Sequence, residues 1–304
     1  METRVLPFNG SSIAEAARLI FAGQPVAVPT ETVYGLAADA TNAEAVARIY
    51  EAKGRPSFNP LIVHVPNLYS AQVIGGFGEE ALALAREHWP GPLTIVVPLK
   101  EGAPIASLVT AGLPSVGLRV PDHPAMQALL RACGRPLAAP SANASGSISP
   151  TRAEHVLRSL GGRIPLIIDG GPTKRGIEST IVAATAGRFR LLRRGPVAVD
   201  AELASGATIE APGQLASHYA PSKPLRLNAT SAADDEYLIG FGEISGNESL
   251  SRAADMVEAA SRLFELLHAA DASDRQRIAV APVPNDGLGA AINDRLNRAA
   301  ADQP

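Results

Sequence analysis

The sequence predicts an α/β protein with a large mixed sheet, followed by a smaller α/β domain. Short apolar segments alternate with amphipathic ones from residue 11 to residue 202, the pattern of a sheet covered by helices. The last apolar segments of this part follow one another without a helix, which indicates an antiparallel portion of the sheet. At 304 residues the chain exceeds the usual size of a single core, so two domains are expected.

The first domain is expected to span residues 1–203. Its strands are short apolar runs, and they fall at residues 26–29, 61–65, 93–99, 115–120, 137–140, 166–169, 179–183 and 189–192. Its clearest helices are amphipathic, and they fall at residues 12–21, 79–88, 125–133 and 152–160. A further short helix is expected to end at Gly54 and to begin at Thr41, which stands at capping-box spacing from Glu44.

Glycine, proline, serine and histidine dominate residues 204–224, which predicts a linker. Residues 225–304 then resume the alternation, with strands expected at 237–241 and 278–282 and helices at 250–267 and 290–299. A strand, a crossover helix and a second strand of this length form a βαβ unit. This part has no G-x-G-x-x-G motif, so no dinucleotide site is predicted there.

Composition limits the partners that can be expected. A net charge of −3 provides no global basic footprint, so any contact with RNA is expected to be local and weak. A single cysteine, Cys133, argues against an internal disulfide and a thiolate zinc cluster, and the histidines are scattered, so no metal site is expected. No apolar run approaches the ~20 residues of a membrane span, and the protein is expected in the cytoplasm.

The strongest chemical signal is a basic loop after the first short helix. Lys53, Arg55 and Asn59 follow one another there, and a guanidinium fork, an ammonium and backbone N–H groups together match a phosphate. Both basic side chains are expected to face solvent and phosphate. A solvated helix end, favoured by the helix dipole, would explain them equally well.

Polar residues at two strands form a second candidate set. Thr30, Thr32 and Tyr34 are expected in the turn after a strand, where ligands of open α/β sheets bind, although a capped polar turn is the commoner case. His64 stands in an apolar strand, where a satisfied core histidine is the usual interpretation.

Small polar residues dominate the loop 140–149, whose hydroxyls and amides could serve a nucleotide or could form ordinary Asx turns. Ser179 and Arg193 are expected on neighbouring strands. Alternating charges on an edge strand would also explain Arg190 and Arg193, and the sequence leaves open whether Arg193 or Arg194 points inward.

Five segments, in order along the chain, resemble the YrdC-like L-threonylcarbamoyladenylate synthases in their longer, two-domain form. They are P-T-E-T-V-Y-G-L at 29–36, K-x-R-x-x-x-N-P-L at 53–61, P-S-A-N at 140–143, P-G-Q-L-A-S-H-Y-A-P at 212–221, and the tail 278–299 with P-x-P-N-D-G-L-G-A-A-I-N-D-R-L. The resemblance implies a twisted open mixed sheet in the first domain and a small Rossmann-like second domain. It favours Arg193 over Arg194 as the inward residue.

The resemblance also assigns residues to substrates. It implies an L-threonine site made by Thr32, His64, Arg119, Ala139 (through its backbone) and Ser179. It implies an ATP site made by Arg55, Asn59, Ser115, Ser141, Asn143, Ser149, Arg193 and Tyr219. Lys53 and Arg55 are expected to be catalytic in an electrostatic sense, by offsetting charge on the phosphates.

The implied reaction joins L-threonine, bicarbonate and ATP into L-threonylcarbamoyladenylate and pyrophosphate, for the threonylcarbamoyl modification of adenosine 37 in tRNA. Mg²⁺ is expected with the ATP phosphates, and a tRNA threonylcarbamoyl transferase machinery is the expected downstream partner. Two alternatives stay open. The first is a carbamoyl-transfer enzyme of hydrogenase maturation, which uses a related domain but carries cysteine-rich zinc motifs that are absent here. The second is a non-catalytic RNA-binding module, which the net negative charge disfavours.

The linker 204–224 is expected to act as a lid. It holds His218 and Tyr219, two large side chains that a plain spacer does not need. The family resemblance implies that Tyr219 closes over the nucleotide. A tether whose tyrosine packs against the domain surface is the alternative.

Overall fold

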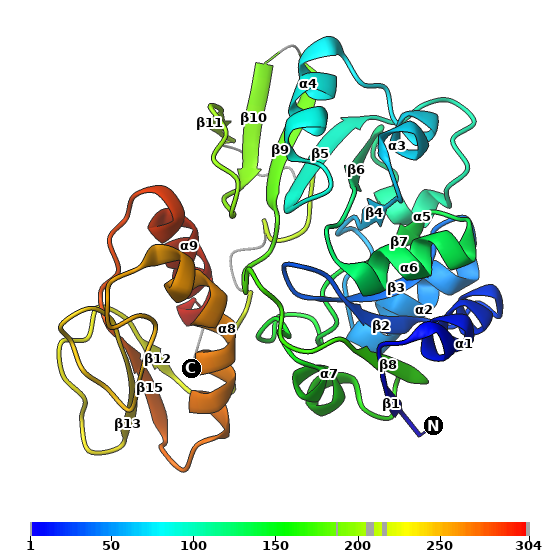
Figure 1. Cartoon of the computed structure of the whole chain (residues 1–304). Coiled ribbons are helices and arrows are strands. Elements are labelled where there is room, and N and C mark those ends of the chain that lie inside the picture. Colours follow the sequence, from blue (N-terminus) through cyan, green and yellow to red (C-terminus); the bar gives the residue numbers. More distant parts are fainter. Residues whose placement is uncertain (1, 187, 205–209, 215–217, 302–304) are drawn as a thin grey trace.

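The computed structural model describes residues 2–186, 188–204, 210–214 and 218–301, which form a large and a small α/β part (Figure 1). In the described residues of the large part, one mixed sheet has the strand order β1-β8-β2-β3-β7-β4-β6-β5-β9-β10-β11. Its strands are β1 (Arg4–Pro7), β2 (Val26–Pro29), β3 (Tyr34–Asp39), β4 (Ile62–His64), β5 (Leu93–Pro98), β6 (Ser115–Arg119), β7 (Leu137–Ala138), β8 (Leu166–Asp169), β9 (Thr180–Ala186), β10 (Arg188–Arg193) and β11 (Glu202–Leu203).

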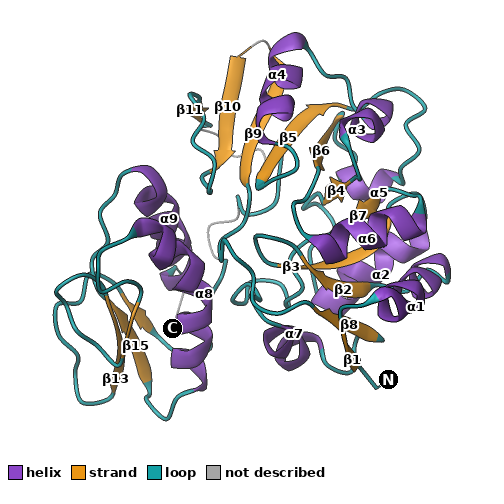
Figure 2. Ribbon diagram, in the orientation of Figure 1, coloured by secondary structure: helices purple, strands orange, loops and turns teal. Residues whose placement is uncertain are grey.

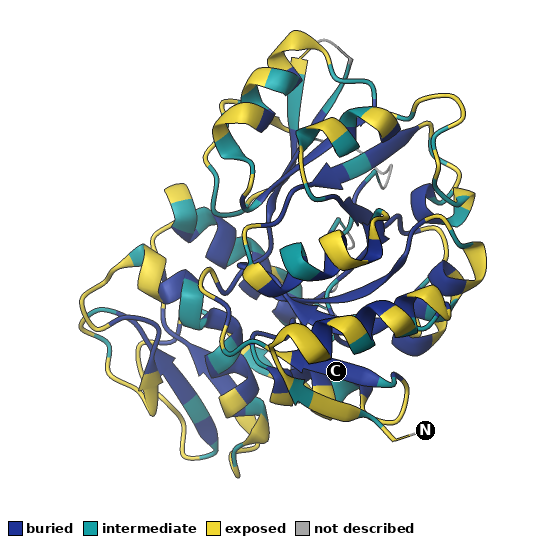
Figure 3. Cartoon of the chain, turned by 45° about the vertical axis from the view of Figure 1, so that its right-hand side comes forward, coloured by how far each residue is buried: buried dark blue, intermediate teal, exposed yellow. Residues whose placement is uncertain are grey.

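Helices cover this sheet, as the alternation of the sequence predicts. They are α1 (Gly10–Phe21), α2 (Ala43–Lys53), α3 (Leu68–Ile74), α4 (Glu79–His88), α5 (Ser107–Thr110), α6 (Pro124–Cys133) and α7 (Ala153–Leu160). Figure 3 shows buried strands beneath helices whose outer faces are exposed. The antiparallel portion is also present, because β9 pairs antiparallel with β10.

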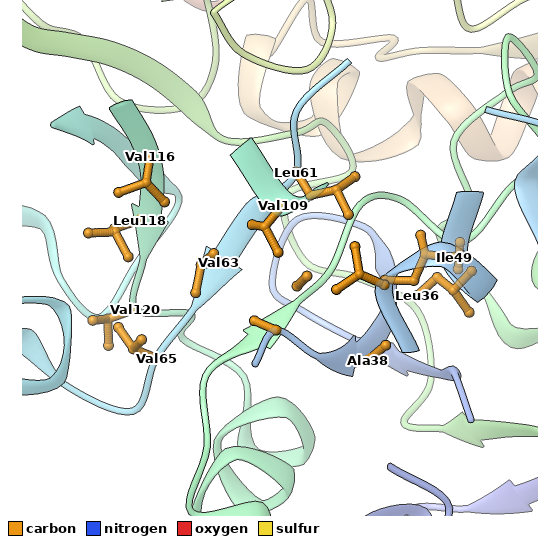
Figure 4. Close-up of a cluster of buried hydrophobic side chains, with 14 of the residues drawn as sticks. Leu36, Ala38, Ile49, Leu61, Val63, Val65, Val109, Val116, Leu118 and Val120 are labelled. Atoms are coloured by element: carbon orange, nitrogen blue, oxygen red, sulfur yellow. The ribbon is translucent and has the colours of Figure 1, made fainter. Parts of the chain in front are cut away.

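The main core lies on one face of the sheet. Successive side chains of a strand point to opposite faces, so Leu61, Val63 and Val65 share a face, and so do Val116, Leu118 and Val120. Figure 4 shows these six side chains together with others from β3, α2 and α5 in one buried cluster. The opposite face of β4 and β6 therefore carries Ile62, His64 and Arg119.

The small part contains a parallel sheet with the order β12-β15-β13-β14. Its elements are β12 (Leu225–Arg226), β13 (Glu236–Gly240), β14 (Glu248–Ser249), α8 (Met256–Ala272), β15 (Arg277–Val280) and α9 (Gly287–Ala300). The parallel pairing of β13 with β15 across α8 confirms the predicted βαβ unit. Figure 2 shows α8 and α9 between this sheet and the large part.

The two parts contact each other through α8 and α9. Arg152, which caps α7, donates to Glu265 on α8 at 2.6 Å. The His155 and His268 rings stack with centroids 3.8 Å apart, and His268 Nε2 lies 3.1 Å from the Ser149 carbonyl oxygen. The described residues of the predicted linker contain no named helix or strand, and its residues 205–209 and 215–217 lie outside the described chain.

Several element predictions were wrong in detail. The N-cap of α2 is Asn42, whose side chain accepts from the Glu44 and Ala45 N–H groups, whereas Thr41 donates to Asp39 instead. β1, β3, α3 and α5 were not predicted, and Tyr34 begins β3 rather than lying in the turn. The first helix of the small part begins at Met256, where Asp255 caps it, and not at residue 250. Among the described residues, no helix combines the length and apolarity that a membrane crossing requires.

Candidate active site

A tight turn between β2 and β3 fixes Thr32. The Thr30 hydroxyl donates to the Val33 carbonyl at 2.7 Å and lies 2.8 Å from the Thr32 hydroxyl. The Thr30 oxygen also accepts from the N–H groups of Thr32 and Val33. This pattern is a capped polar turn, the alternative that the sequence left open, and it leaves Thr32 fully buried on the side of β4 and β6.

His64 and Arg119 lie beside each other because β4 and β6 pair in parallel with these two residues in register. Burial, together with the smaller effect of the Arg119 charge, lowers the pKa of His64 to about 3, so the imidazole is neutral at neutral pH. His64 Nδ1 is buried without a hydrogen-bond partner among the described residues. A core histidine normally has its buried nitrogen satisfied, so this Nδ1 atom stays available for a further hydrogen bond.

Arg119 is held by a carboxylate that the sequence analysis did not single out. Its Nη2 donates to Glu31 Oε1 at 2.6 Å and to the Thr32 hydroxyl at 3.0 Å. The side chains of Arg119 and Glu31 are only 5% and 4% exposed. Removing one member of such a buried pair typically destabilises a protein by about 3–5 kcal/mol, so Glu31 is a structural part of the site.

Ser179 is bound by an arginine from the neighbouring strand. Arg193 Nη2 donates to the Ser179 hydroxyl at 3.1 Å, and its Nε donates to the Ser179 carbonyl at 3.0 Å. The Ser179 hydroxyl also lies 2.8 Å from that of Thr94. Arg193 is buried and Arg194 is exposed, which confirms that the first of the two points inward.

The expectation that Lys53 and Arg55 face solvent was wrong, because they are only 2% and 8% exposed. Lys53 Nζ donates to the backbone carbonyls of Ser141 and Asn143. Arg55 donates to the carbonyls of Asn59 at 3.3 Å and Pro60 at 3.0 Å. The basic loop therefore folds inward onto the loop that follows β7.

Lys53, Arg55 and Arg193 share an unusual property: none of them forms a salt bridge with a carboxylate in the described part of the chain. Burial lowers the pKa of all three, for Arg55 to about 10. Burial disfavours the charged form of a basic side chain, and a nearby negative charge favours it again. An anion placed beside these three side chains would therefore stabilise their charged forms.

A small cavity of about 40 Å³ joins these groups. All five residues expected to bind threonine line it, together with four of those expected to bind ATP. These nine are Thr32, His64, Arg119, Ala139, Ser179, Arg55, Ser141, Arg193 and Tyr219. The remaining lining residues are Val33, Ile62, Pro140, Glu178, Pro212, Gly213 and His218.

The other predicted residues do not line this cavity. Lys53 and Asn143 lie behind it, joined by the Lys53 hydrogen bond to the Asn143 carbonyl. Ser149 donates to Glu178, which does line the cavity. Asn59 lies in the basic loop, and Ser115 begins β6 at the end away from Arg119.

Buried polar atoms without partners gather at this site. Most of the unpartnered buried atoms found among the described residues belong to predicted site residues, and one belongs to His218, which precedes Tyr219. They are both side-chain amide atoms of Asn59, His64 Nδ1, Asn143 Oδ1, His218 Nδ1 and the Tyr219 hydroxyl oxygen. Native proteins satisfy nearly all of their buried polar groups, so such a concentration indicates a place where a ligand completes the hydrogen bonding.

Comparison with known proteins explains this arrangement. The model of the Sua5, YciO and YrdC proteins, described as "Telomere recombination", matches residues 18–195, and that of the "Threonylcarbamoyl-AMP synthase, C-terminal domain" matches residues 173–301. The chain belongs to the Sua5 family. Threonylcarbamoyl-AMP synthase from Bacillus subtilis (strain 168) is 40% identical over 98% of this chain and 95% of its own length.

The archaeal Sua5 relatives show the same extent of similarity. Threonylcarbamoyl-AMP synthase from Pyrococcus abyssi is 38% identical over 94% of this chain and 93% of its own. The crystal structure of P. abyssi Sua5 complexed with L-threonine matches with a TM-score of 0.88 and 36% identity, over 98% of this chain and 97% of that one. The two-domain Sua5 architecture that the sequence motifs implied is thereby confirmed.

Proposed function

We propose that the protein is an L-threonylcarbamoyladenylate synthase that uses L-threonine, bicarbonate and ATP. The observation that carries this proposal is the cavity at which two buried arginines without carboxylate partners, Arg55 and Arg193, meet polar groups of amino-acid-binding type. Its Sua5 relatives have this activity in their names, and the one with the similar structure binds L-threonine.

The proposed division of the site follows its chemistry. Arg119 is suited to the threonine carboxylate, because a guanidinium matches a carboxylate with two donors. The hydroxyls of Thr32 and Ser179, the neutral His64 imidazole and the Ala139 backbone surround the rest of the amino acid. Lys53, Arg55 and Arg193, with Asn59, Ser115, Ser141, Asn143 and Ser149, make the proposed ATP side.

In the proposed reaction the threonine nitrogen adds to CO₂ and loses a proton, or reacts with bicarbonate and releases water, to form a carbamate. A carbamate oxygen then attacks the α-phosphorus of ATP. The P–O bond to the β-phosphate breaks and pyrophosphate leaves. The substrates supply the nucleophile, so the protein has to orient them and neutralise charge. Lys53 and Arg55 would do the latter.

Magnesium is proposed to enter with ATP. Mg²⁺ prefers oxygen ligands and commonly takes one or two carboxylates together with phosphates. Here the cavity-lining carboxylate, Glu178, already accepts from Ser149 and Arg295, and the described residues contain no cluster of three or more metal-binding side chains. The ion would therefore be held mainly by the phosphates.

The product is proposed to pass to a tRNA threonylcarbamoyl transferase in the cytoplasm, where ATP and tRNA are available. Direct contact with tRNA is proposed to be local and weak, because the net charge of −3 provides no global basic footprint. The carbamoyl-transfer alternative receives no support, because the chain holds one cysteine and its second domain matches the synthase model.

The amino-acid pocket is expected to read the threonine hydroxyl. Serine should be a poorer substrate, with kcat/KM reduced ~10- to 200-fold, since it lacks one methyl group. Valine should be rejected by at least ~1000-fold, because it leaves buried polar groups unpaired. Pyrophosphate release with each amino acid measures both values. Comparable release with valine would show that the hydroxyl is not read.

The linker 204–224 is proposed to close over the substrates. Pro212, Gly213, His218 and Tyr219 already line the cavity, and Tyr219 has a left-handed backbone (φ 67°) that its packing must hold. Saturating ATP and L-threonine should therefore slow cleavage of the linker by a broad-specificity protease several-fold. Equal cleavage rates with and without both substrates would remove the basis for a lid.

A further inference from the structure

Glu178 is a carboxylate placed beside a site that attracts anions. It lies in the segment before β9, is 6% exposed and lines the cavity. Both of its oxygens are occupied: Oε1 accepts from the Ser149 hydroxyl, and Oε2 accepts from Arg295 Nε at 3.0 Å. Without its cation, this buried charge would repel the carboxylate and phosphates that the site is proposed to bind.

The cation that neutralises Glu178 comes from the other end of the chain. Arg295 lies on α9 of the second domain, 117 residues away in sequence, and is fully buried at 0% exposure. Its Nη1 donates to Asp294 at 2.9 Å. Its guanidinium carbon lies 5.5 Å from the centroid of the Tyr219 ring, a cation–π geometry.

Tyr219 is thus held on two sides by the second domain. Its ring centroid lies 5.5 Å from that of Phe264 on α8, and Arg295 lies over the same ring. One arginine therefore contacts both a carboxylate and an aromatic wall of the cavity. Neither contact could be seen from the sequence, where Arg295 belongs to an ordinary amphipathic helix.

We propose that Arg295 is a positioning residue for the reaction, through which the second domain completes the active site. It neutralises the negative charge of Glu178 and holds that carboxylate so that its other oxygen accepts from the Ser149 hydroxyl. It also fixes the Tyr219 ring at the cavity wall. Arg295 itself contacts no substrate in this arrangement. The inference rests on the proposed function and assigns the second domain a part in substrate binding rather than only in stability.

The test compares Arg295→Met with wild-type enzyme and with Glu265→Gln, using the full-length chain. Glu265→Gln removes another ion pair between the domains, that with Arg152, which does not line the cavity. Arg295→Met should raise KM for ATP at least tenfold in threonine-dependent pyrophosphate release, whereas Glu265→Gln should leave KM within twofold of the wild-type value.

Rescue separates positioning from simple destabilisation. Removing the charge of Glu178 should remove the repulsion, so Glu178→Gln/Arg295→Met should recover most of the lost ATP affinity. If Arg295→Met does not fold, Arg295→Lys takes its place, since it keeps the charge but loses the second contact, and a smaller rise in KM is expected.

Unchanged KM, with kcat reduced only by the fraction of unfolded protein seen in thermal melts, would overturn the proposal. So would a double variant no better than Arg295→Met, or an Arg295→Lys variant with unchanged KM. Wild-type enzyme is assayed in parallel. If the proposed function is wrong, the wild type itself shows no threonine-dependent pyrophosphate release, whereas if only the role of Arg295 is wrong, the wild type remains active.

Discussion

Replacing Lys53 with methionine should lower the rate of pyrophosphate release at least ~100-fold. Loss of one positioned donor to a developing charge typically costs roughly 3 kcal/mol of barrier, and Lys53 is also the group that ties the end of α2 to the loop after β7. Methionine keeps an unbranched side chain that is only one heavy atom shorter than that of lysine, so the measured loss mainly reports the ammonium rather than a cavity.

The same variant should also lose stability, because two buried carbonyl oxygens lose their donor, at about 1–3 kcal/mol for an unsatisfied buried group. Lys100→Met is the matched control, since exposed Lys100 donates to the Gln72 carbonyl and neither residue lines the cavity. Steady-state kinetics and urea unfolding of both variants provide the measurements. A Lys53 variant with wild-type kcat and KM would contradict the electrostatic role of this lysine.

Arg193→Met is the second substitution with a large expected effect. It removes the donors to both the hydroxyl and the carbonyl of Ser179 and a buried positive charge from the proposed ATP side. Because it affects both substrates, kcat/KM should fall at least ~100-fold for threonine and for ATP.

The adjacent residue supplies the control for this substitution. Arg194 is exposed and outside the cavity, so Arg194→Met should keep kcat/KM within twofold of wild type. The two arginines are adjacent at the end of β10, so in the unfolded chain both side chains are exposed to solvent in the same way. Equal losses in the two variants would show that general destabilisation, and not the contacts to Ser179, explains the effect.

The sequence predicted most of the sheet because its strands are apolar runs bounded by turn residues, and it predicted the site through short motifs that lie at strand and helix ends. It placed His64 correctly in a strand but could not show which face it occupies, since strands buried on both faces lack an alternating pattern. The register of His64 with Arg119 resolves this, because the core side chains Val63 and Leu118 occupy the other face.

What escaped prediction depends on contacts between residues distant in the chain. Glu31 and Arg119 are 88 residues apart, and nothing local marks Glu31 as buried. The burial of Lys53 follows from the loop after β7 folding back over α2, which a helix-end pattern cannot reveal. Glu178 stands in G-I-E-S-T beside a predicted site residue, the only local signal that could have drawn attention to it.

The most direct test of the central claim is an assay with ¹⁴C-labelled bicarbonate and ATP, in the presence and absence of L-threonine. The account predicts that label enters a compound with the mass of threonylcarbamoyl-AMP, in a one-to-one ratio with pyrophosphate, only when all three substrates are present. Pyrophosphate release that does not need threonine, or label that never appears in an adenylate, would contradict it.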